Sequence, residues 1–152
     1  MDYEVVNIEE KMVAGIRIRT KNSDKNVNRD IGMLWDKFYK ERIYESIPNK
    51  KNGKSIGLYT NYESDVNGAY DVFVCCEVKS LSNLPEKVEL KIIPGGKYAK
   101  FIVKGDTHKA AAEFWMKLWN MNIDRKYSCD FEEYQESSDM NNAEIHIYIS
   151  LN

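Results

Sequence analysis

The alternation of hydrophobic and polar positions in the first part of the chain predicts four short strands and one amphipathic helix. Residues 3–8 and 12–18 are rich in β-branched side chains and are separated by a polar Glu-Glu-Lys turn. Residues 55–62 and 70–78 predict two further strands, joined by a segment that contains Asn67-Gly68, a dipeptide suited to tight reversals. Between the two strand pairs, apolar and aromatic side chains recur at helical spacing: Ile31, Leu34, Trp35, Phe38 and Tyr39.

The same order of elements is predicted a second time. Strands are expected at residues 88–93 and 98–104, a helix near residues 107–121, and strands at residues 129–135 and 143–151. Four shifts of the numbering match the two sets, and they differ because the loops differ in length. For shifts of 85, 80, 73 and 72 residues, the matched pairs include Ile16 with Phe101, Trp35 with Trp115, Val74 with Ile147, and Tyr59 with Phe131.

These patterns predict one α+β domain spanning residues 1–152, built from duplicated ββαββ halves of about residues 1–80 and about residues 86–152. A half with four short strands and one helix cannot cover both faces of its own sheet. We therefore expect antiparallel sheets and two main helices related by a pseudo-twofold axis. Such an arrangement leaves a cleft between the halves, which is a preferred place for a small ligand.

Composition narrows the classes of partner. The 22 basic and 24 acidic residues are spread along the chain and give a net charge of -2, so we expect no direct contact with nucleic acid. The first residues show neither a secretory pattern nor a long apolar run, so we expect a cytoplasmic protein with no membrane association. Cys75 and Cys76 are adjacent in a predicted strand and point to opposite faces, which suits a reducing compartment.

We expect neither a metal nor a cofactor. His108 and His146 have no second histidine, cysteine or carboxylate at the spacing of metal ligands. Gly95-Gly96 follows a proline between two strands, and a turn explains it better than a phosphate-binding loop does.

Three segments of the second half resemble a known family. Residues 105–120 (GDTHKAAAEFWMKLWN), 129–135 (CDFEEYQ) and 143–151 (AEIHIYISL) are similar to the end of gyrase-inhibitor-like and AraC-type effector-binding domains. In the first half, residues 31–41 (IGMLWDKFYKE) look like the first helix of that family. The resemblance implies the effector-binding-domain, or SOUL-like, fold. Because the first family-like strand begins at about residue 3, it also implies a standalone ligand binder without a DNA-binding unit.

The resemblance also implies a pocket glutamate on the strand after the second helix, which we align with Glu132. A one-residue error in that alignment would select Glu133, on the opposite face. A buried carboxylate among aromatic rings favours a lipophilic cation. Core packing is the competing interpretation for most of the aromatic side chains. The predicted ligand-binding residues are Glu132, Trp35, Tyr59, Tyr98, Trp115, Trp119 and Tyr134.

Three functions follow as hypotheses. The first is a non-enzymatic module that binds an amphipathic or cationic compound. The second is a hydrolase of strained, cyclopropane-containing molecules, with Glu132 as general base and Tyr98 or Tyr134 polarising the substrate. The third is inhibition of a topoisomerase through the acidic segments at residues 63–65 and 132–139, and a protein partner or a homodimer stays open with it.

Overall fold

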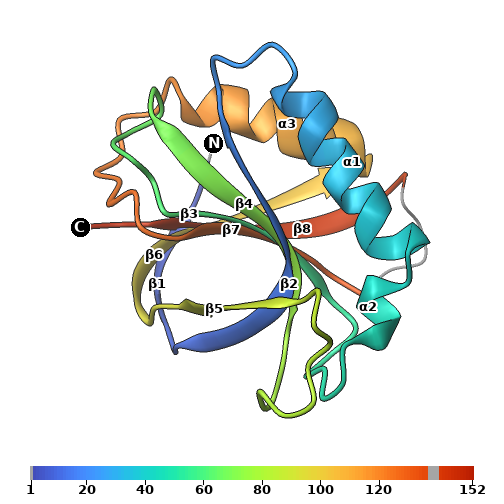
Figure 1. The fold of residues 1–152 in the computed structure, drawn as a ribbon. Coiled ribbons are helices and arrows are strands. Elements are labelled where there is room, and N and C mark those ends of the chain that lie inside the picture. Colours follow the sequence, from blue (N-terminus) through green and yellow to red (C-terminus); the bar gives the residue numbers. More distant parts are fainter. Residues whose placement is uncertain (1, 137–140) are drawn as a thin grey trace.

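A computed structural model describes residues 2–136 and 141–152, and its eight strands form one antiparallel sheet (Figure 1). The elements are β1 (Glu4–Ile8), β2 (Lys11–Lys21), α1 (Val27–Lys40), α2 (Ile43–Ser46), β3 (Ser55–Thr60), β4 (Ala69–Glu77), β5 (Glu89–Ile93), β6 (Gly96–Gly105), α3 (Thr107–Leu118), β7 (Asp130–Tyr134) and β8 (Ala143–Ser150). The strand order across the sheet is β1-β6-β8-β7-β3-β4-β2-β5.

This strand order carries the predicted pseudo-twofold symmetry. When β1 to β4 are exchanged with β5 to β8, the order reads the same from the opposite edge. The axis passes between β3 and β7, which pair at the centre. The duplicated α+β architecture is therefore confirmed, with one difference: the halves share a single sheet. Each half gives its first strand to the other, because β1 pairs with β6 and β5 pairs with β2.

The strand registers correct one of the four sequence shifts. In β3 and β4, Gly57 pairs with Val74, and in β7 and β8, Glu132 pairs with Ile147. Because Val74 matches Ile147, Gly57 must match Glu132, which is a shift of 75 and not the predicted 72. The predicted shift differs from the observed one by three residues. Because side chains alternate between the two faces of a strand, this odd difference matched Tyr59 with a residue on the other face of the sheet.

Both long helices cover the same face of the sheet (Figure 1). On α1, Leu34 and Phe38 are buried against the inner positions of β2 and β4. On α3, Phe114 and Leu118 are buried against the isoleucines of β8. Each such side chain contributes about 1.5–3 kcal/mol by leaving water. The two helices are thus anchored at separate places, with the central strands β3 and β7 between them.

The opposite face of the sheet curls around a second core, which includes Ile56, Leu58 and Phe131. The turn before β6 closes this face against the turn after β1. A Cβ at Gly95 would lie 3.0 Å from the carbonyl oxygen of Ile8, a tighter contact than most side chains make, so the close approach of the two turns favours glycine.

The three cysteines are buried and unpaired with one another, as the adjacency of Cys75 and Cys76 predicts. None of the helices in the described residues is long and apolar enough to span a membrane.

Candidate ligand-binding site

The centre of the sheet presents the carboxylate of Glu132 to the space beneath the two helices. Glu132 lies on β7 opposite Gly57 of β3, and only 2 % of Glu132 is exposed. Alternation along the strands places Tyr59, Asp130 and Tyr134 on this same helix-facing side. Polar side chains therefore gather in the middle of the sheet, between the two areas that α1 and α3 cover with apolar side chains.

Neutral donors hold the carboxylate of Glu132. Trp115 donates from Nε1 to Oε2 over 2.8 Å, and the hydroxyls of Tyr59 and Tyr134 donate to Oε1 over 3.1 and 3.5 Å. Burial raises the pKa of Glu132 above its ordinary value, and these three hydrogen bonds oppose the shift. Burial, reinforced by the nearby carboxylate, raises the pKa of Tyr59 and of Tyr134 well above normal, so both remain donors.

Glu133, the alternative in the sequence alignment, lies on the other face of the sheet. It accepts from Gln135 Nε2 over 2.9 Å and forms an ion pair with Lys54 at 3.6 Å. Glu132 and Glu133 are both buried, so the predicted acidic surface segment at residues 132–139 is wrong at its start. Residues 137–139 of that segment lie outside the described residues.

Two pairs of aromatic rings flank Glu132 symmetrically. Trp115 of α3 meets Tyr59 edge to face at 5.0 Å between ring centres, and Trp35 of α1 meets Tyr134 in the same way at 5.1 Å. Shifts of 80 and 75 residues exchange one pair with the other, so the pseudo-twofold axis relates them.

Gly57 makes the room for this arrangement. A Cβ at that position would lie 2.8 Å from Oε1 of Glu132 and 3.2 Å from Cζ2 of Trp35. At the two symmetry-equivalent positions, the first half therefore has a glycine without a side chain and the second half has the carboxylate of Glu132. The role of Gly57 could not be predicted from the sequence, because a glycine is neither an apolar nor a polar position in the alternation that identifies a strand.

A cavity of about 360 Å³ opens between α1 and α3 beside this cluster. Its walls include Ile31 of α1, Tyr70 of β4 and Trp119, which directly follows α3 and is 54 % exposed. Tyr59 and Trp115 also line the cavity, and both donate to Glu132, which is not itself among the lining residues.

Of the predicted site residues, Tyr98 is the one that the structure places elsewhere. It is 3 % exposed in the core on the opposite face of the sheet, and its hydroxyl donates to the carbonyl oxygen of Pro94 over 2.7 Å. The reason is strand alternation, since its neighbours Ala99 and Phe101 contact the α3 side. Tyr98 therefore cannot act together with Glu132.

Arg125 and Asp130 also belong to this region and were not predicted. Arg125 lines the cavity, and its Nη2 donates to Oδ2 of the fully buried Asp130 over 2.9 Å. The alternation of Asp130, Glu132 and Tyr134 in the segment DFEEY was the available sequence signal for Asp130.

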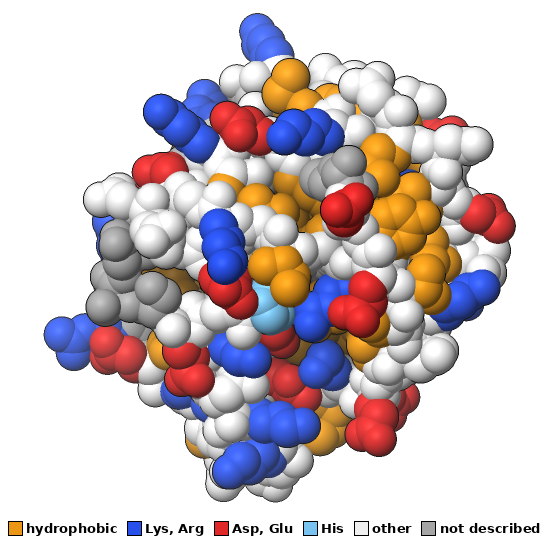
Figure 2. Space-filling view, turned by 180° about the vertical axis from the view of Figure 1, so that it is seen from behind, with side chains coloured by type: hydrophobic (Ala, Val, Ile, Leu, Met, Phe, Trp, Pro, Cys, Tyr) orange, Lys and Arg blue, Asp and Glu red, His pale blue; other side chains and the backbone are white. Residues whose placement is uncertain are grey.

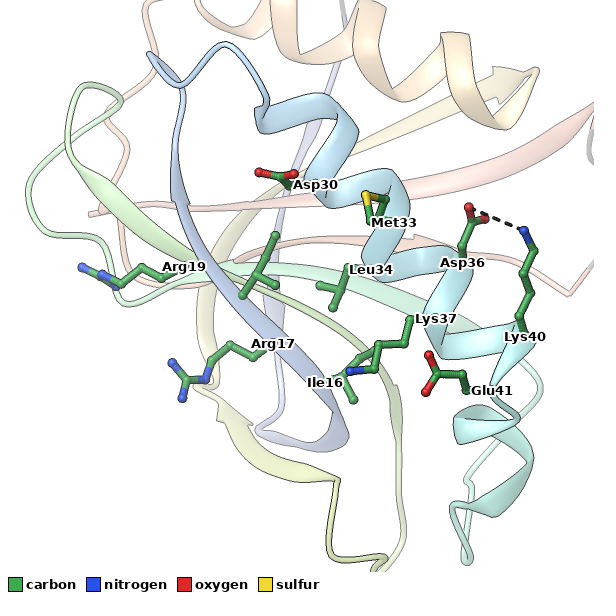
Figure 3. A pocket seen from close by; sticks show the side chains of 11 residues that line it. Ile16, Arg17, Arg19, Asp30, Met33, Leu34, Asp36, Lys37, Lys40 and Glu41 are labelled. Atoms are coloured by element: carbon green, nitrogen blue, oxygen red, sulfur yellow. Dashed lines mark ion pairs between the residues drawn. The ribbon is translucent and has the colours of Figure 1, made fainter.

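A second, larger hollow of about 650 Å³ lies on the outer side of α1 (Figure 3). Arg17 and Arg19 of β2 stand on one side of it, and Lys37 and Lys40 of α1 stand on the other. Arg17 and Arg19 are already paired with Asp71, and Arg17 also pairs with Glu89 at 3.1 Å, so their charges are compensated. None of the predicted site residues lines this hollow.

Charges of both signs are mixed over the face shown in Figure 2, where hydrophobic side chains gather at one side. Within residues 2–136 and 141–152, no three histidine, cysteine, aspartate or glutamate side chains are grouped to hold a metal ion.

Comparison with known proteins identifies the family. The family model of the integron-associated effector-binding protein Cass2 matches residues 4–151. The chain belongs to the Cass2 family. An integron cassette protein from the mobile metagenome of Vibrio cholerae is 33% identical, with a TM-score of 0.75, and the match covers 97% of this chain and 95% of that one. The predicted membership among effector-binding domains is confirmed.

Two further proteins resemble this Cass2-family chain, one in sequence and one in fold. YobU of Bacillus subtilis strain 168, which is named as a candidate transcriptional regulator, is 28% identical over 97% of this chain and 96% of its own. SAV2435, solved with tetraphenylphosphonium bound, is 20% identical with a TM-score of 0.81 and shares the fold over 100% of this chain and 94% of its own.

Proposed function

We propose that this protein binds amphipathic organic cations between α1 and α3, with Glu132 as the counter-charge. The observation that carries the proposal is the uncompensated charge of Glu132. Within the described part of the chain, its partners are neutral donors from Trp115, Tyr59 and Tyr134. A buried carboxylate without a cationic partner is costly, and a bound cation would offset that cost.

The aromatic walls support the same ligand class. Trp115 and Tyr59 present ring surface to the cavity, and Trp119 stands at its exposed side. Each cation placed over such a ring gains roughly 0.5–2 kcal/mol, depending on its desolvation. A lipophilic cation would bury apolar surface and meet these rings, whereas a small hydrated cation would lose its water without the apolar gain.

Glu132 is 2 % exposed and does not line the cavity, so a ligand reaches it only if the side chains around it, which include those of Tyr59 and Trp115, move. Binding should therefore change the surroundings of Trp115. Tryptophan fluorescence is the natural signal.

Two probes of one shape and opposite charge test the proposal. Tetraphenylphosphonium, the ligand in the SAV2435 structure, is the cation, and tetraphenylborate is its anionic counterpart. We expect the cation to quench tryptophan fluorescence saturably and the anion to bind at least roughly 10-fold more weakly, since a buried carboxylate repels it. Equal binding of the two ions, or no binding of the cation, would contradict the proposal.

Hydrolysis is supported by fewer observations. Of the two tyrosines predicted to polarise its substrate, Tyr98 lies on the other face of the sheet from Glu132, and only Tyr134 lies beside it, donating to Oε1 over 3.5 Å. No observation in the described residues favours a topoisomerase as a partner, so binding of a small molecule is the function that we carry forward.

A further inference from the structure

We infer that Arg125 is a second polar anchor of this cavity, and that the preferred ligand is a cation that also carries a hydrogen-bond acceptor oxygen. This inference rests on the proposed function, because it assigns a second contact to a ligand held by Glu132. Arg125 belongs to the segment between α3 and β7, and its side chain forms part of the cavity wall.

The guanidinium of Arg125 is held rigidly. Its Nη2 donates to Asp130 over 2.9 Å, and its central carbon lies 4.3 Å from the ring centre of Tyr127. The backbone is fixed as well, through a β-bridge between Arg125 and Leu151. A planar fork held in this way loses little further freedom when it binds a ligand.

Asp130 has no capacity left for the other donors of this arginine. Besides Arg125, its Oδ2 accepts from the Tyr62 hydroxyl over 2.7 Å. Its Oδ1 accepts from the backbone N–H and the hydroxyl of Ser150, over 2.8 and 3.0 Å. Asp130 is thus saturated, and its charge compensates that of Arg125.

Some N–H groups of Arg125 make no hydrogen bond within the described residues. Only 9 % of its side chain is exposed. Its Nε is shielded from solvent and has no hydrogen-bond partner among the described residues, so a ligand oxygen reaches this atom only when the surrounding side chains move. An unused buried donor destabilises the free protein, and an acceptor on a ligand would offset that cost. Because Asp130 already balances the charge, a neutral ester or ketone oxygen suffices.

The strand geometry sets the separation of the two anchors. Asp130 and Glu132 lie two positions apart on the same face of β7, which corresponds to roughly 7 Å along the strand. Arg125 is hydrogen-bonded to Asp130, and the proposed cation pairs with Glu132. The acceptor and the positive centre of the ligand should therefore be separated by a short chain.

The pseudo-twofold axis shows that this use of Arg125 is particular to the second half. Its equivalent is Lys50, because the bridge between Lys50 and Val78 matches that between Arg125 and Leu151. The Lys50 ammonium donates to the carbonyl oxygens of Tyr44 and Ile47, over 3.1 and 2.7 Å, and lies 4.9 Å from the ring centre of Tyr44. The first half thus has no guanidinium at the matching place, and its cation is held by the α2 segment.

Two triphenylphosphonium probes test the inference, one with a pentyl chain and one with a chain of equal length that ends in a methyl ester. Wild type should bind the ester roughly 5- to 10-fold more tightly, the gain of one hydrogen bond. The Arg125→Lys variant keeps a positive charge beside Asp130 but loses the fork, and should bind both probes equally. Arg17→Lys, an ion-paired arginine outside the cavity, is the matched control and should keep the preference.

A spectroscopic readout keeps the inference testable if Arg125→Lys folds poorly. In wild type, the ester should shift the Nε–H resonance of Arg125, and the pentyl probe should leave it in place. Equal affinity of wild type for the two probes, an ester preference retained by Arg125→Lys, or an unmoved Nε–H resonance would overturn the inference. If the pentyl probe itself fails to bind wild type, the proposed function fails, which is a separate outcome.

Discussion

The two halves of this molecule have one backbone plan and different side chains at its centre. The second half places Asp130 and Glu132 on the helix-facing side of β7, and the first half places Ser55 and Gly57 at the matching positions of β3. Arg125 and Lys50 form a third unequal pair. The symmetric parts, which are the helices, the sheet and the flanking rings, build the cleft. The unequal parts supply its chemistry.

This comparison teaches where a duplicated domain can become specific. Two glutamates facing each other across the axis would repel at close range, and both would resist ionisation. A glycine opposite one glutamate removes that conflict and gives the carboxylate room, as the short distances from a Cβ at Gly57 show. The following predictions test each element of the asymmetry.

The largest effect is expected from Glu132→Gln. This change removes the charge and keeps the shape, so tetraphenylphosphonium affinity should fall roughly 100-fold, as when one partner of a buried charge pair is removed. Glu133→Gln is the matched control on the other face and should leave the affinity unchanged. Isothermal titration calorimetry measures both, and a similar loss in the two variants would contradict the assignment.

A smaller loss is expected from Gly57→Ala. The added Cβ must displace Glu132 or Trp35, so affinity should fall roughly 10-fold and stability by about 1–3 kcal/mol. Gly32→Ala is the control, because a Cβ on that glycine of α1 meets nothing within 4 Å. It should be neutral or stabilise the protein by up to about 1 kcal/mol. Chemical denaturation and titration of both variants distinguish crowding of the site from a general glycine effect.

Phenylalanine substitutions separate the two symmetry-related tryptophans. Trp115→Phe removes the Nε1–H donor to Glu132, so near neutral pH the affinity for the cation should fall roughly 5-fold, with a greater fall in acid. Trp35→Phe keeps an aromatic ring beside Tyr134 and removes no bond to Glu132, so it should change affinity by less than roughly 2-fold. Tyrosine fluorescence or calorimetry avoids the loss of the tryptophan signal. Equal effects would show that the rings act only by packing.

The smallest effect concerns stability and pH. Burial raises the pKa of Glu132 in the folded protein, so the folded state binds a proton more tightly than the unfolded state. The contribution of Glu132 to stability is therefore present below its unfolded pKa and is lost as the pH rises through its folded pKa. Glu132→Gln should be more stable than wild type at neutral pH, and the difference should shrink in acid. Thermal unfolding across pH measures this, and a variant that is less stable at every pH would contradict it.

Much of the fold could be predicted from the sequence because periodicity reports burial directly. The strand pairs and the two long helices follow from apolar spacing, and the shift of 85 residues is matched by the pairing of Lys11 with Ile93 and of Ile8 with Gly96. The helix α2, of four residues, was missed because so short a segment shows no period. The exchange of β1 and β5 between the halves was also missed, since strand order depends on contacts distant in sequence.

The site was only partly predictable. Glu132 and its aromatic neighbours stood out by type, but the choice between Glu132 and Glu133 depends on the face of the strand, which only the register with β3 decides. Tyr98 was assigned to the wrong face for the same reason. Arg125 follows no periodic pattern, because it lies outside the strands and reaches the cavity through tertiary packing.

The most direct test of the central claim is the pKa of the Glu132 carboxyl, followed by carbon NMR with and without saturating tetraphenylphosphonium. In the free protein, this pKa should lie above the ordinary value of a glutamate, because the group is buried. A bound cation stabilises the charged form, so the pKa should fall on binding. A Glu132 pKa at the ordinary value, unchanged when the cation binds, would contradict the assignment of Glu132 as its counter-charge.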